Sequence, residues 1–172
     1  MKVSDHIANW AAAISPRAYG VCGAGSMHLN DSFYHHPGIE AMSMHHEQAA
    51  AFAAEADARV SGKPGIVLVT AGPGGTNAIT GIASAFVDSI PMIVIAGQVT
   101  SSTRSHGKQR QLGLNELDGT SLVRGITKYA TTVTDVKDVP CVLERAMNEA
   151  TSGRPGPVWI EVPLDIQNSE IQ

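Results

Sequence analysis

The chain has 172 residues, of which 43% are hydrophobic and 16% are charged. This composition suits one globular unit with a buried core and argues against a disordered chain. The formal net charge of −4 at pH 7 gives no electrostatic reason to expect a nucleic-acid partner. The apolar start of the chain is interrupted by Asp5 and His6. It therefore predicts neither a signal peptide nor a membrane span, and the cytoplasm is the expected compartment.

Short β-branched runs alternate with longer alanine-rich segments, which is the pattern of a parallel α/β sheet covered by helices. Strands are expected at Ala18–Cys22, Glu40–Met44, Ile66–Thr70, Met92–Ala96, Tyr129–Val133 and Val158–Val162. Helices are expected at Val3–Ile14, Met27–Tyr34, His46–Gly62, Gly75–Asp88, Gly119–Arg124 and Val136–Ser152. The third and fourth strands contain no polar alternation, so both are expected to be buried on two faces. Ser4 and Asp135 are each expected to cap the helix that follows.

Three further features concern the cysteines, a long loop and the tail. Cys22 and Cys141 lie far apart in apolar segments, so buried free thiols are expected. The segment 100–117 is polar, contains glycines and has no clear period, and a loop of that length is usually functional or mobile. The polar residues 165–172 predict the start of an interdomain linker, so the domain is expected to span residues 1–164.

Two glycine-containing turns follow predicted strands, at residues 23–26 and 71–77. Both are expected at the carboxyl edge of the sheet, where open α/β proteins bind ligands. Neither completes a dinucleotide fingerprint, because His28 and Asn77 stand where the third glycine belongs. No Gly-Lys-Ser/Thr follows either turn, so a Walker-type phosphate loop is not predicted. A tight strand-to-helix turn remains an equal interpretation of the glycines alone.

Glu47 lies where the second predicted strand leads into a helix with seven alanines between residues 49 and 58. On its own, a carboxylate in a first helical turn is more often solvated and favoured by the helix dipole. The neighbouring histidines at positions 35, 36, 45 and 46 lack the i, i+4 spacing of a zinc-binding helix. A metal site is therefore not expected in this chain.

Several motifs then follow one another in an order that is similar to one family. They are His46-Glu47-Gln48, the run 62–77 with Gly-Lys-x-Gly-Ile-Val-Leu-Val-Thr-x-Gly-Pro-Gly-Gly-Thr-Asn, and the segments 88–91, 96–99, 126–128 and 153–158. From about residue 18 to residue 167, they resemble the N-terminal pyrimidine-binding domain of thiamine-diphosphate enzymes of the acetolactate synthase group. The number of independent motifs makes the resemblance specific.

The resemblance implies a flavodoxin-like (Rossmann-like) parallel six-stranded sheet with helices on both faces. It also implies thiamine diphosphate as the cofactor and a 2-keto acid as the small-molecule substrate. Glu47 falls on the family's glutamate, which hydrogen-bonds the ring nitrogen N1′ and so activates the cofactor. Pro73 and Asn77 are expected against the pyrimidine, together with backbone groups at Ala24 and Gly25.

Leu114 and Asn115 stand where acetolactate synthases usually carry phenylalanine and glutamine, on the substrate side of the cofactor. This departure leaves open whether the reaction is a carboligation or a decarboxylation. Family members bind the diphosphate and Mg²⁺ through a separate domain with a Gly-Asp-Gly…Asn signature, which this sequence does not contain. The expected partner is therefore a second copy of the chain or a diphosphate-binding domain or subunit. Alone, the chain is expected to be inactive.

Alternative interpretations stay open at this point. The chain is expected to be a fragment of a three-domain enzyme, and the alternative is the pyrimidine-binding subunit of a split decarboxylase such as sulfopyruvate decarboxylase. A non-catalytic flavodoxin-like nucleotide-binding module is a third possibility, because a fold does not determine a function. Glu47 argues against that third interpretation, since such a module has no need of a carboxylate there.

Overall fold

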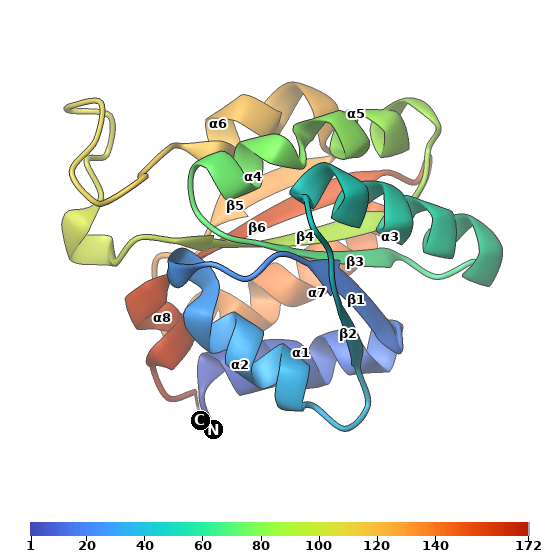
Figure 1. Cartoon of the computed structure of the whole chain (residues 1–172), viewed down its shortest axis with the longest axis horizontal. Helices are drawn as coiled ribbons and strands as arrows, with labels where there is room; N and C mark the ends of the chain where they lie inside the picture. The colour runs from blue at the N-terminus through green and yellow to red at the C-terminus, as the bar shows by residue number, and fades with distance from the viewer. Residues whose placement is uncertain (172) are drawn as a thin grey trace.

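The structure is a computed structural model that describes residues 1–171. Within these residues, six strands form one all-parallel sheet in the order β2-β1-β3-β4-β6-β5 (Figure 1). The strands are β1 (Arg17–Gly20), β2 (Glu40–Ser43), β3 (Gly65–Val69), β4 (Met92–Gln98), β5 (Tyr129–Thr132) and β6 (Pro157–Pro163). The flavodoxin-like fold expected from the sequence is confirmed.

Helices cover both faces of the sheet (Figure 1). One layer, below the sheet in this view, contains α1 (Val3–Ile14), α2 (Met27–His35), α7 (Val139–Thr151) and α8 (Leu164–Asn168). The other layer contains α3 (Glu47–Ser61), α4 (Pro73–Asn77), α5 (Ile79–Val87) and α6 (Gly119–Val123). Short 3₁₀ turns, η1 (Ala24–Ser26), η2 (Ser101–Thr103), η3 (Arg124–Ile126) and η4 (Val136–Asp138), lie in the connections. None of the helices in residues 1–171 is long and apolar enough to cross a membrane.

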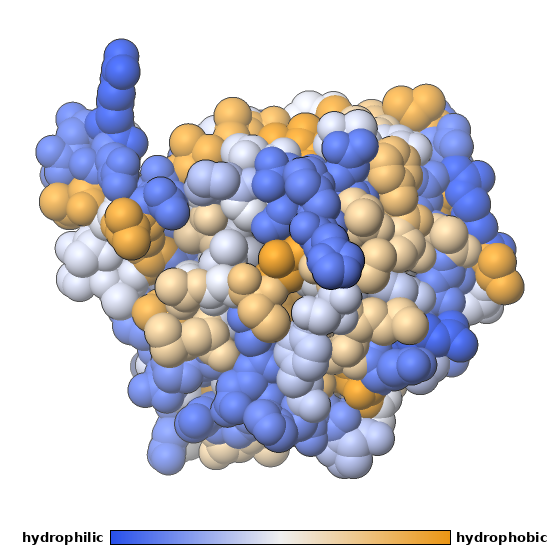
Figure 2. All heavy atoms as spheres, in the orientation of Figure 1, coloured by the Kyte–Doolittle hydropathy of each residue, from blue (hydrophilic) through white to orange (hydrophobic). Residues whose placement is uncertain are grey.

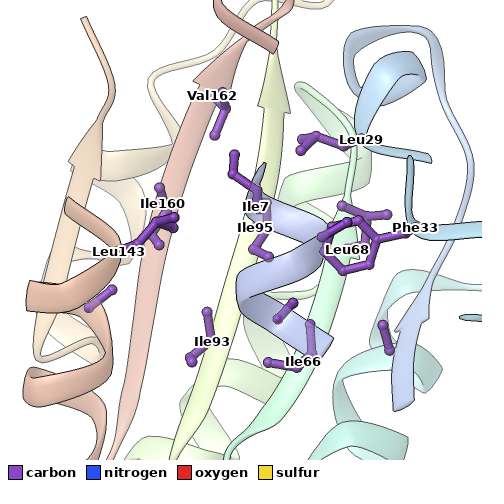
Figure 3. Close-up of a cluster of buried hydrophobic side chains, with 14 of the residues drawn as sticks. Ile7, Leu29, Phe33, Ile66, Leu68, Ile93, Ile95, Leu143, Ile160 and Val162 are labelled. Atoms are coloured by element: carbon purple, nitrogen blue, oxygen red, sulfur yellow. The ribbon is translucent and has the colours of Figure 1, made fainter. Parts of the chain in front are cut away.

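Large side chains fill the space between the sheet and the first layer (Figure 3). The helices contribute Ile7, Leu29, Phe33 and Leu143, and the strands contribute Ile66, Leu68, Ile93, Ile95, Ile160 and Val162. These residues are at most 3% exposed. Their burial supplies most of the apolar area that stabilises the domain, because the stabilisation is roughly proportional to that area.

Small side chains dominate the opposite interface. Here α3 contributes Ala50, Ala51 and Ala54, which pack with Ala85 of α5 and with Trp159 of β6. The side chains of β3 and β4 are buried on both faces, as the absence of polar alternation predicts. Alanines allow α3 to lie directly on β1 and β3, so the backbone of this helix comes close to the sheet.

The predicted strands are confirmed to within two residues, but two predicted helices are divided. In place of one helix at 75–88, α4 ends at Asn77 and α5 begins at Ile79. The amide of Ala78 donates to the Gly75 carbonyl at 3.1 Å, so the backbone tightens by one residue between the two helices. Likewise, residues 136–138 form η4 before α7 begins, and the Asp135 side chain caps η4 by accepting from the Lys137 amide.

Two smaller predictions are wrong. Ser4 does not cap α1, because the helix begins at Val3 and Ser4 lies buried inside it, where its hydroxyl accepts from Ser32 at 2.8 Å. The cysteines Cys22 and Cys141 are free, as expected, but both are exposed. Cys22 comes after the last residue of β1, at the carboxyl edge of the sheet, and Cys141 lies on the outer side of α7.

The polar tail contains a short helix, α8, whose Ile166 and Gln167 are buried. The Gln167 amide donates to the carbonyls of Gly25 and Val162, each at 2.8 Å. Beyond it, a bridge between Lys2 and Glu170 brings the two ends of the chain together (Figure 1). Where the domain ends and a linker begins stays a prediction.

Candidate functional site

Two turns meet at the carboxyl edge of the sheet. Strand β1 pairs with β2 on one side and with β3 on the other, and ligands of open α/β sheets bind where the strand order reverses in this way. The turn after β1 contains η1, and the turn after β3 leads into α4. A methyl group built on Gly25 would lie 2.9 Å from the Cβ of Ala71. The two turns are therefore in direct contact, at the place that the sequence predicts for a ligand.

Glu47 is the first residue of α3 and its side chain enters the same region. His46 is the N-cap of the helix, and its ring Nδ1 accepts the Gln48 amide at 3.1 Å. This cap satisfies one of the free amides of the first turn and fixes where the helix begins. Glu47 is only 8% exposed. It is thus not the solvated first-turn carboxylate that its position alone would favour.

Glu47 and Asn77 are brought together although they are 30 residues apart. The Asn77 Nδ2 donates to the Glu47 Oε2 at 2.9 Å. The carboxyl group of Glu47 makes no other hydrogen bond within residues 1–171. A Cβ built on Gly74 would lie 3.2 Å from Glu47 Oε1 and 2.6 Å from Thr70 Cγ2. Position 74 therefore suits only glycine, because a side chain there would collide with Thr70 and crowd Glu47 Oε1.

The other residues predicted from the sequence are distributed around this pair. Pro73 is the first residue of α4, four residues before Asn77. Ala24 is exposed at the start of η1. Asn115 lies on the loop before α6 with φ of 58°, and the preceding Leu114 is 80% exposed. Glu47 and Asn77 touch each other, whereas the Leu114 side chain faces outward.

Glu161 is a buried polar residue that the sequence reasoning missed. It is 2% exposed, and its Oε2 accepts the Thr132 hydroxyl at 3.0 Å. Burial raises the pKa of Glu161 above its ordinary value of 4.5, and the Thr132 hydrogen bond opposes this change only in part. A lone acidic residue in the otherwise apolar run of β6 was the available signal. The cavity that Glu161 lines also contacts Thr70, Ala71 and Gly72 of the second turn.

The fold and the candidate site together define the class of the protein: a parallel α/β domain with a candidate ligand site at the reversal point of the sheet and a buried carboxyl group beside it. More specifically, the chain belongs to the family described as thiamine pyrophosphate enzyme, N-terminal TPP binding domain, which it matches over residues 1–122.

Three relatives show which proteins this chain is similar to. The chain is 43% identical over 148 residues to the chloroplastic acetolactate synthase of Arabidopsis thaliana, covering 84% of this chain and 21% of that protein. It is 41% identical over 152 residues to the acetolactate synthase isozyme 3 large subunit of Escherichia coli, covering 88% and 26%. It is 41% identical over 154 residues to the mitochondrial acetolactate synthase of Schizosaccharomyces pombe, covering 90% and 22%. The chain thus spans about a quarter of the length of these relatives, and the resemblance to the acetolactate synthase group is confirmed.

Proposed function

We propose that this chain forms the pyrimidine-binding half of the active site of a thiamine-diphosphate-dependent enzyme that acts on 2-keto acids, and that Glu47 activates the cofactor. The observation that carries this proposal is the arrangement of Glu47. The residue is buried, Asn77 donates to one carboxyl oxygen, and the other oxygen lies beside the backbone of Gly74 with no hydrogen-bond partner within residues 1–171. Such an arrangement suits a carboxyl group that exchanges a proton with a bound ring.

Residues of the two contacting turns supply the other proposed contacts to a flat heteroaromatic ring. Asn77 hydrogen-bonds to the carboxyl group, Pro73 begins the same helix, and the contacting turn offers backbone groups at Ala24 and Gly25. We propose that these residues hold the aminopyrimidine of thiamine diphosphate. When bound, this cofactor supplies a carbon nucleophile and an electron sink for the loss of carbon dioxide from a 2-keto acid.

Glu47 acts through its free oxygen in this proposal. With Oε2 fixed by the Asn77 amide, Oε1 is the oxygen that holds a proton toward the ring nitrogen N1′. Asn77 orients the carboxyl group, and the alanine-lined packing of α3 fixes its distance from the turn.

The rest of the active site is proposed to come from a partner. The diphosphate and Mg²⁺ would be held by a separate domain or subunit, and a second copy of the chain would complete the assembly. Leu114 and Asn115 would lie on the substrate side. The names of the relatives favour a carboligation of the acetolactate type over simple decarboxylation, and the cytoplasm remains the proposed compartment.

Replacing Glu47 by glutamine in the full-length protein tests the proposal. Glutamine keeps the size of the side chain but cannot supply the proton. Turnover of a 2-keto acid should fall by about 10²–10⁴-fold, the usual contribution of a positioned acid or base, while the affinity for thiamine diphosphate stays near that of the parent. Glu144→Gln, the same change on exposed α7, is the matched control. Parent-like turnover of Glu47→Gln would refute the assigned role.

A further inference from the structure

The connection between β4 and α6 projects from the carboxyl edge of the sheet as a polar loop (Figures 1 and 2). Glu116 holds this loop in shape. Its Oε1 accepts the Ser105 amide at 2.6 Å and the Ser105 hydroxyl at 2.8 Å, and its Oε2 accepts the amides of Leu112 at 2.8 Å and Gly113 at 3.4 Å. Desolvation would raise the pKa of Glu116, but the hydrogen bonds outweigh it and lower the pKa. The loop is therefore folded around an ionised carboxylate.

The base of the loop touches the turn that leads into α4. The carbonyl oxygen of Asn115 lies so close to Gly72 that a Cβ there would be 2.2 Å from it. Gly72 has φ of 62° and immediately precedes Pro73. Only a glycine fits between the loop and the strand end in this conformation. The loop and the proposed cofactor site are thus fixed relative to each other by a backbone contact.

Beside this contact, the loop encloses a pocket of about 220 Å³ that contains both acidic and basic side chains. Charged and titratable residues that line it are Arg104, His106, Arg110, Glu116 and Asp118. Both carboxylates are already engaged: Glu116 by the loop, and Asp118 by the Thr120 hydroxyl and by the amide and hydroxyl of Ser121. Their acceptor capacity is therefore used by the protein itself.

The cations of the pocket are not engaged in this way. Across residues 1–171, the guanidinium groups of Arg104 and Arg110 make no hydrogen bond and no ion pair within 4.0 Å. The charge of Arg104 acts on the carboxyl groups of Glu161 and Asp118 in the direction that lowers a pKa, although burial raises the pKa of Glu161 overall, so the charge of Arg104 is partly balanced. Arg110 is exposed. A guanidinium group offers five donors in a planar fork that matches a carboxylate.

We propose that this pocket binds the distal anionic group of the substrate, so that the enzyme prefers a 2-keto acid with a second carboxylate. Arg110 and Arg104 are specificity-determining residues in this account, and Glu116 is a positioning residue. The inference rests on the proposed function, because it concerns the substrate of that site. The inference goes beyond the proposed function because it assigns the chemical class of the substrate, from two arginine side chains that make no ion pair within 4.0 Å in residues 1–171.

Two 2-keto acids of equal length separate the charge from the size of the substrate. 2-Oxoglutarate and 2-oxopentanoate share a five-carbon chain and differ in a terminal carboxylate against a methyl group. The full-length enzyme should show the higher kcat/KM for 2-oxoglutarate. Arg110→Gln and Arg104→Gln should each lower that value about tenfold to hundredfold, the range for losing a hydrogen bond to a charged group, and leave 2-oxopentanoate unchanged. Lys63→Gln removes an exposed cation between α3 and β3 and is the matched control.

A binding experiment keeps this inference separate from the proposed function. Calorimetric titration of the full-length protein with glutarate and with pentanoate requires no turnover. Glutarate should bind more tightly, and the difference should disappear in Arg110→Gln. If glutarate binds in this way but neither keto acid is turned over, the pocket is supported and the proposed function fails. If both keto acids are turned over equally well and glutarate does not bind better, the pocket is refuted and the proposed function stands.

Discussion

The two faces of the sheet differ in what they bury. On one face, helices α1, α2 and α7 contribute large side chains such as Leu29 and Phe33. On the other, α3 contributes alanines, and the polar groups Glu47, Asn77 and Glu161 lie on this side of the sheet. Small side chains bury less apolar area and stabilise less, but they allow a helix backbone to lie close to the sheet. The comparison indicates that the first face stabilises the domain and the second face positions the site.

Phe33→Ala tests the stabilising role of the first face and should have the largest effect on stability. Phe33 is fully buried, so its truncation should lower the free energy of unfolding by about 3–5 kcal/mol. Denaturant unfolding of the protein measures the change. Phe52→Ala, at a position that is 39% exposed on α3, is the control and should cost much less. Equal losses at the two positions would contradict the comparison.

Ala51→Val tests the positioning role of the second face. Ala51 is fully buried between α3 and its neighbours, so two added methyl groups should cost about 1–3 kcal/mol by overpacking. Because α3 carries Glu47, its displacement should lower turnover more than Phe33→Ala does at equal fraction folded. Ala56→Val on the exposed side of α3 controls for the lower helix propensity of valine. If Ala51→Val destabilises the protein and leaves turnover unchanged, α3 does not position the site.

Glu161→Gln should have the smallest effect, and that effect should depend on pH. The raised pKa of Glu161, caused mainly by burial, means that the folded state binds its proton more tightly than the unfolded state does. The resulting stabilisation is present below the ordinary value of 4.5 and is lost as the pH rises through the raised pKa. Glutamine does not titrate, so the variant should gain stability relative to the parent between about pH 5 and about pH 8. A difference that is the same at both pH values would contradict the assignment.

Much of the fold could be predicted because its signals are local. The apolar runs of β3 and β4 predict strands buried on two faces, and the order of motifs predicts a site at the carboxyl edge of the sheet. The division of the helix at Ala78 was not visible, because helix propensity does not report a tightened turn. The exposure of Cys22 and Cys141 depends on which side of each segment faces outward. The apolar composition of the surrounding segments therefore did not predict it.

The sequence alone could not predict which residues of the candidate site contact one another. Glu47 and Asn77 were each expected at the cofactor, but their hydrogen bond arises only when α3 and α4 pack on the same face. The same holds for the fold of the loop around Glu116 and for its backbone contact with Gly72. These are contacts between segments that are far apart in the chain, and no local pattern encodes them.

The central claim is that Glu47 activates the cofactor, and the most direct test is the exchange of the C2 hydrogen of bound thiamine diphosphate with deuterium. This exchange needs no substrate, so it is independent of the loop and of the rest of the reaction. In the full-length protein, Glu47→Gln should slow the exchange by about 10²–10⁴-fold, whereas Glu144→Gln should exchange at the parent rate. Exchange at the parent rate in Glu47→Gln, with the cofactor bound, would contradict the account.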